Sequence, residues 1–83
     1  MQLILVHETK DFDGWKTAFD QDAEDRAQAG LSVLQVWKGD GIAAALFQVA
    51  DRPRAQTFLD TQDLLLRNRT GLTHHHHHFV ETA

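Results

Sequence analysis

The sequence predicts an α+β domain in which four strands and two helices alternate in the order strand, helix, strand, strand, helix, strand. Three observations carry this prediction: short apolar runs rich in branched side chains, two helical stripes that each begin at an aspartate, and a glycine turn between two central apolar runs. The 83 residues make a single domain, residues 1–83. A chain this short buries only about 60% of its unfolded surface by itself, so association with a second copy would add stability.

Three segments in the first half of the chain are typical of strands. The run at residues 3–6 is short, apolar and branched, and the runs at residues 31–38 and 42–49 have the same strand preference. The Gly-Asp-Gly sequence at residues 39–41 separates the last two runs. A connection of about three residues with two glycines predicts a hairpin, so these two strands should be antiparallel neighbours.

Two segments are typical of helices. Asp11 precedes aromatic and alanine side chains spaced by three and four residues, which predicts a helix over residues 12–29 that ends at Gly30. Asp51 can cap a second helix in which Pro53 occupies the first turn, where proline is tolerated.

This order of elements fits the ferredoxin-like βαββαβ sandwich, a four-stranded antiparallel sheet of order 4-1-3-2 with both helices on one face. Alternation along each strand then divides the side chains between the two faces of the sheet. Toward the helices we expect Ile4, Val6, Leu34, Val36, Ala45, Phe47, Val49 and Phe79. Toward the other face we expect Leu3, Leu5, His7, Val33, Gln35, Trp37, Ala44, Leu46, Gln48, His76, His78 and Val80.

The second of these faces is too apolar to be left in water, because it would expose Leu5, Val33, Trp37 and Leu46 together. We therefore predict a homodimer that buries this face and encloses a cleft. The ligand-binding residues that we predict on the cleft walls are His7, Gln35, Trp37, Leu46 and Gln48.

Five consecutive histidines, residues 74–78, precede Phe79 and Val80, so the run is expected inside a last strand rather than in a tail. Side chains separated by one residue on a strand point the same way about 6 to 7 Å apart, a spacing that one metal ion could bridge. The candidate ligands for a divalent transition metal such as zinc are His74, His76 and His78, with His7 from the first strand. The competing interpretation is that the run is solvated or pairs with carboxylates.

His76 and His78 are also candidate catalytic residues. Imidazoles change charge between about pH 5 and 7, and one of these two could act as general base on an acidic C–H or phenol held against Trp37. Base catalysis of this kind needs no cofactor and suits an oxygenase or a cyclase. The competing interpretation is that both histidines merely fill the dimer cleft.

Two stretches of the chain resemble known proteins. One is Lys10-Asp11-Phe12-Asp13-Gly14-Trp15, followed by Phe19-Asp20, Arg26 and Gly30, and the other is Ala55-x-x-Phe58-Leu59 with Asp63-Leu64. Both resemble small members of the dimeric α+β barrel superfamily, which includes cofactor-free antibiotic-biosynthesis monooxygenases, cyclase-like proteins and many members with no established activity. The resemblance implies a homodimer that binds a hydrophobic or aromatic compound. The turn at residues 39–41 and the connection at residues 67–73 depart from the family pattern, so no substrate or catalytic residue carries over.

The composition excludes several classes of function. A formal charge of −4 offers no basic surface for nucleic acid, and the absence of cysteine removes disulfides and thiolate chemistry. No stretch has the character of a signal peptide or a membrane span, so we expect a cytoplasmic protein without a membrane partner. Three functions remain: a small-molecule-binding homodimer, with or without a cofactor-free oxygenase or cyclase activity; a non-enzymatic histidine-rich metal-binding protein; or a structural or assembly domain whose cleft is filled by its own side chains.

Overall fold

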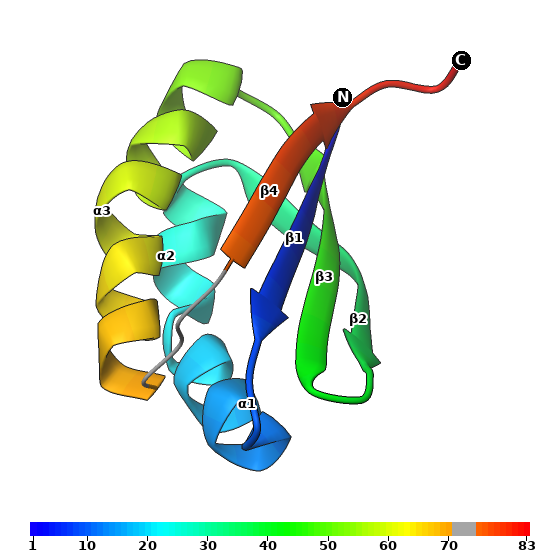
Figure 1. The fold of residues 1–83 in the computed structure, drawn as a ribbon. Helices are drawn as coiled ribbons and strands as arrows, with labels where there is room; N and C mark the ends of the chain where they lie inside the picture. Colours follow the sequence, from blue (N-terminus) through cyan, green and yellow to red (C-terminus); the bar gives the residue numbers. More distant parts are fainter. Residues whose placement is uncertain (71–74) are drawn as a thin grey trace.

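The computed structural model describes the backbone of residues 1–70 and 75–83 and the side chains of residues 1–61 and 76–83. In chain order its elements are β1 (Gln2–Glu8), α1 (Phe12–Gln21), α2 (Ala23–Gln28), β2 (Leu31–Lys38), β3 (Ile42–Val49), α3 (Arg52–Thr70) and β4 (His75–Val80). The strands form one antiparallel sheet of order β2-β3-β1-β4, which is the predicted order 4-1-3-2 counted from the other edge. The three helices lie on one side of this sheet (Figure 1), so the predicted α+β, ferredoxin-like fold is confirmed.

The expected first helix over residues 12–29 is two helices, because the chain turns at Asp22. The break is held together from both sides by the carbonyl oxygen of Phe19. This oxygen accepts a hydrogen bond from the Asp22 N–H at 3.2 Å and another from the Arg26 guanidinium at 2.6 Å. The guanidinium also lies 3.7 Å from the centroid of the Phe19 ring, an attractive cation–π geometry. Arg26 is therefore buried although it is charged, and its side chain links α2 to the end of α1.

The second long helix, α3, begins as the sequence predicts. The side chain of Asp51 accepts a hydrogen bond from the Arg54 N–H at 3.2 Å, which satisfies one of the free donors in the first turn. The Arg54 guanidinium in turn donates to the carbonyl oxygen of Gln28 at the end of α2, so the two helices are joined at this end. Among the residues that the structure describes, no helix is long and apolar enough to cross a membrane.

The core lies between α1, α3 and the sheet, and its centre is aromatic. Trp15 stacks on Phe19 with ring centroids 4.7 Å apart, and Phe19 contacts Phe47 of β3 with centroids 6.1 Å apart. Aromatic pairs at such offset distances contribute beyond the area that they bury. The buried apolar side chains are Leu3, Leu5, Trp15, Ala18, Phe19, Ala29, Leu31, Ala43, Ala45, Phe47, Val49, Ala55, Phe58 and Leu59.

A buried hydrogen bond joins the first helix to the first strand. The indole N–H of Trp15 donates to Nδ1 of His7 at 2.8 Å, and both side chains are 0% exposed. Because an indole nitrogen can only donate, Nδ1 of His7 is the acceptor of this hydrogen bond. The imidazole edge meets the indole at an interplanar angle of 80°. His7 is thus a packed and hydrogen-bonded part of the core.

The face predicted for β1 is wrong. We expected Ile4 and Val6 toward the helices, but Leu3, Leu5 and His7 lie there and are buried. Directly opposite residues of an antiparallel pair share a face, and these three lie opposite Phe47, Ala45 and Ala43 of β3, which are buried as well. The strand is apolar at both parities, so alternation alone does not orient it.

A β-bulge changes the faces of β2. Val33 lies opposite Phe47 and Gln35 lies opposite Leu46, so Leu34 is the extra residue between two successive pairs. Leu34, expected in the core, is 50% exposed, and Val33, expected on the other face, shares the face of Phe47 but is 45% exposed. Beyond the bulge the expected alternation resumes, with Val36 packed on the core and Trp37 on the opposite face.

Replacing Trp15 with phenylalanine should destabilise the fold by about 1–3 kcal/mol, because Nδ1 of His7 would lose its buried donor. Urea unfolding followed by circular dichroism measures this loss. Gln21→Ala, an exposed change at the end of the same helix, is the control and should stay within about 0.5 kcal/mol of the unmodified chain. Equal stability of the Trp15 variant and the unmodified chain would show that this hydrogen bond does not hold the helix to the sheet.

Two glycines with positive φ should differ in their tolerance of alanine. Gly30 (φ 77°) and Gly41 (φ 73°) both adopt the left-handed region, which costs a side chain about 1–2 kcal/mol. A Cβ at residue 30 would also come within 3.3 Å of the Cβ of Ala50, whereas a Cβ at residue 41 meets nothing within 4 Å. Gly30→Ala should therefore lower the thermal midpoint more than Gly41→Ala. The reverse ranking in thermal unfolding would contradict this assignment.

Candidate functional site

The side of the sheet opposite the helices is the candidate site. We call it the open face, since the helices pack on the other side of the sheet (Figure 1). Cross-strand pairing places the following residues on it: Gln2, Ile4, Val6, Ser32, Gln35, Trp37, Ala44, Leu46, Gln48, His76, His78 and Val80. Its aliphatic centre is half-buried, and Trp37 at one edge is 46% exposed.

The strand register orders the open face into rows that run across the sheet. One row is Trp37, Ala44, Val6 and His76, in the order β2, β3, β1, β4. The neighbouring row is Gln35, Leu46, Ile4 and His78. In both rows a glutamine or indole on one edge strand and an imidazole on the other enclose aliphatic side chains. The two ends of a row are three strand spacings apart, about 14 Å.

The structure brings most of the predicted site residues to the open face. Those found there are Gln35, Trp37, Leu46, Gln48, His76 and His78. His7 is not among them, because it lies on the helix side against Trp15, and its placement on the cleft wall is wrong. His74 lies outside the described residues.

The predicted metal set does not assemble as a unit. His76 and His78 share the open face, opposite Val6 and Ile4, whereas His7 is opposite His75 and belongs to the helix side. A sheet separates them, so His7 cannot bind the same ion as the other two. Within the described part of the chain no group of three or more His, Cys, Asp or Glu side chains could hold a metal ion. His76 and His78 would supply two of the four ligands that a tetrahedral zinc site requires.

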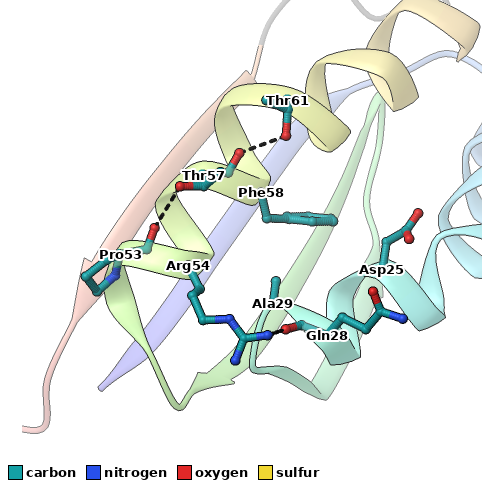
Figure 2. Close-up of a pocket in the computed structure, with 8 residues that line it drawn as sticks. All are labelled: Asp25, Gln28, Ala29, Pro53, Arg54, Thr57, Phe58 and Thr61. Carbon is teal, nitrogen blue, oxygen red and sulfur yellow. Dashed lines mark hydrogen bonds between the residues drawn. The ribbon is translucent and has the colours of Figure 1, made fainter.

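A groove between α2 and α3 lies on the helix layer (Figure 2), with a volume of about 470 Å³. Phe58 and Ala29 form its apolar part, and Asp25 and Arg54 bring charges from the two helices. The polar groups already have structural tasks, since Arg54 donates to the carbonyl oxygen of Gln28 across the groove. None of these residues was predicted as a site residue, and no motif in the sequence marks them. We interpret the groove as the boundary between two packed helices.

A second groove of about 470 Å³ lies where the β2–β3 turn meets the start of α1. Its walls mix Lys10 and Lys38 with three aspartates, and Lys38 Nζ lies 5.5 Å above the ring centroid of Phe12. Asp11 accepts a hydrogen bond from the Gly14 N–H at 3.0 Å and so caps the helix. These contacts are those of a helix cap and a turn, and they give the groove no single charge that would select a ligand.

Comparison with known proteins supports the fold and gives no information about the chemistry of the site. No protein-family model matches the chain, and no curated protein matches it. Among solved structures, the chain is similar to a dimeric ferredoxin-like protein from an uncultured marine organism. The two chains are 12% identical with a TM-score of 0.50, and the match covers 99% of this chain and 95% of that one. A likeness at this identity establishes the shared ferredoxin-like fold.

Proposed function

We propose that the chain functions as a homodimer that buries the open face of each copy and binds a small hydrophobic molecule between the two faces. The observation that carries this proposal is the exposed Trp37 beside the half-buried Ile4, Val6 and Leu46. An antiparallel sheet with one face in water normally carries polar side chains there. An apolar sheet face beside an exposed indole is instead typical of an interaction surface.

The size of the open face supports a second copy as its cover. Four strands of up to eight residues span roughly 19 by 26 Å, about 500 Å² in projection. Side chains roughen this surface, so its accessible area exceeds the projection and approaches the 800 Å² or so that each partner contributes to a standard interface. That contribution is about a sixth of the 5077 Å² that one copy exposes. The dimeric state of the similar solved protein is consistent with this proposal.

The ligand class follows from the side chains on the face. Trp37 offers an indole for stacking, Gln35 and Gln48 offer amides, and His76 and His78 offer imidazoles at the opposite edge. An aromatic compound with an acidic hydroxyl or C–H suits this set, and the resemblance to cofactor-free monooxygenases and cyclases points the same way. In such a reaction the substrate O–H or C–H bond breaks and its proton passes to an imidazole nitrogen of His76 or His78.

The open-face dimer should depend on Leu46, which lies near the middle of the face. Leu46→Asp would place a charge in each half of the interface without a partner, which is costly when desolvated. We expect the variant to sediment as a monomer at micromolar concentration where the unmodified chain is dimeric. Ala23→Asp adds the same charge on the exposed side of α2 and should leave the dimer intact. A dimer that survives Leu46→Asp would exclude the open face as the interface.

Binding of an aromatic ligand should change the fluorescence of Trp37 and leave that of Trp15 unaffected, because Trp15 is enclosed in the core. Titration with 2-naphthol, excited at wavelengths that select indole, should quench emission of the unmodified chain. Trp37→Phe should remove the quenching while the dimer persists in sedimentation. Quenching that remains in this variant would place the ligand near Trp15, under the helices, and would contradict a site on the open face.

A further inference from the structure

We infer that the dimer holds two composite sites, in each of which His76 and His78 of one copy face Trp37 and Gln35 of the other. This inference rests on the proposed homodimer and adds the orientation of its two copies. It also names the ligand that each site would take, a planar aromatic compound with an acidic hydroxyl.

Within one copy, Trp37 and His76 are too far apart to contact the same ligand. Trp37 and His76 belong to the same row but lie on the two edge strands, β2 and β4. Three strand spacings separate them, roughly 14 Å. Val6 and Ala44 fill the row between them. A ring stacked on Trp37 is therefore out of reach of the imidazole on its own chain, and a site that uses both needs the second copy.

The direction of the twofold axis decides which residues of the two copies face each other. Two copies of a sheet can meet face to face about a twofold axis that runs either along the strands or across them, and aligned sheet packing is compatible with both. An axis along the strands reverses the order of strands within each row but keeps the row. It therefore places His76 opposite the partner's Trp37 and His78 opposite the partner's Gln35. An axis across the strands instead places the histidines of β4 over the histidines of the other β4.

Complementarity between the facing side chains favours the axis along the strands. An imidazole edge presents N–H and C–H groups to the electron-rich face of an indole, and the amide of Gln35 can donate to or accept from the imidazole of His78. The alternative axis stacks imidazoles on imidazoles, which repel one another when protonated. In both arrangements the aliphatic centre around Ile4 and Leu46 packs on its own twin.

The position of these sites also gives a ligand a way in. Because β2 and β4 are the two edges of the sheet, each composite site lies at the rim of the interface and the aliphatic centre seals the space between the sites. The ring of the ligand would stack on Trp37 of one copy. Its hydroxyl would donate a hydrogen bond to His76 of the other copy. A molecule could then enter and leave without separation of the dimer.

Cross-linking tests the orientation without a ligand. The chain has no cysteine, so only introduced thiols react. Trp37→Cys and His76→Cys chains are unfolded together, refolded and treated with a bismaleimide that spans the sheet separation of about 10 Å. We expect covalent dimers that contain one chain of each kind, identified by mass. Ala23→Cys, on the helix side, should give none. Covalent dimers formed by His76→Cys alone would overturn the inference, since they require β4 over β4.

Mixed dimers test whether the sites are shared. Trp37→Ala chains and chains with both His76→Gln and His78→Gln should each bind 2-naphthol about tenfold more weakly than the unmodified chain. After joint refolding about half of the dimers are mixed, and each mixed dimer regains one intact site of two, so about a quarter of the full binding capacity should return. No recovery in dimers shown by native mass spectrometry to be mixed would overturn the shared site.

A matched mixture distinguishes this result from sites confined to one chain. Chains that carry all three substitutions are refolded with an equal amount of unmodified chain. Shared sites leave about a quarter of the full capacity, because every mixed dimer loses both sites, whereas sites within one chain leave about half.

Binding of one zinc ion per two chains that requires His76 and His78 would also overturn the inference, because it places the imidazole pairs over each other. An unmodified chain that sediments as a monomer would instead overturn the proposed homodimer, and a dimer that does not bind 2-naphthol would overturn the ligand class.

Discussion

The packing of Trp15 against His7 determines how the rest of the sheet is arranged. This buried pair fixes which side of β1 faces the helices. Because directly paired residues share a face, it also fixes which residues of the neighbouring strands β3 and β4 face the helices. Ala43, opposite His7, joins the core because it shares the same face of the sheet. An inverted β1 would bring Ile4 and Val6 inward and leave the indole N–H without its acceptor.

The same constraint produces the open face. Since Leu3, Leu5 and His7 occupy the helix side, Ile4 and Val6 must point the other way, where the helices cannot reach them. The sheet is therefore apolar on both sides, and helices on one side do not cover the apolar side chains on the other. A second copy packed on this side would shield these apolar side chains from water. The two edge strands supply the functional groups at the borders of that surface: β2 carries an indole and β4 carries imidazoles.

Histidines of the same strand pair have different environments because of alternation. His7 is buried, and its Nδ1 accepts a hydrogen bond from the indole N–H of Trp15. His76 and His78 are exposed at the edge of the open face, where either ring nitrogen can meet a ligand or a second copy. His77 lies opposite Leu5 and so belongs to the helix side. A histidine run that looks uniform in the sequence is therefore divided by the sheet between two environments, with His76 and His78 on one side and His77 on the other.

The sequence alone determined the order of the elements, the sheet order and the presence of an apolar face beyond the reach of the helices. These features follow from local signals: the aspartate caps, the glycines at the helix end and the hairpin, and the apolar runs. It also identified Trp37, Leu46, His76 and His78 as residues of one face, because alternation places them there once Val36, Phe47 and Phe79 point inward. The break at Asp22 depended on contacts of Arg26 with Phe19, which no local pattern reveals.

Only the tertiary structure decided which side of β1 is buried and where β2 slips by one residue. A strand that is apolar on both of its faces has no preferred buried face until a helix packs on it. One sequence signal favoured the observed arrangement: the polar residues Gln2 and Glu8 at the ends of β1 alternate in step with Ile4, which points away from the helices. His7 was expected on the cleft wall because alternation groups it with Leu3 and Leu5, whereas a hydrogen-bond donor eight residues away makes it a core residue. The bulge at Leu34 likewise arises from the fit between strands, and that fit exists only once β3 lies alongside β2.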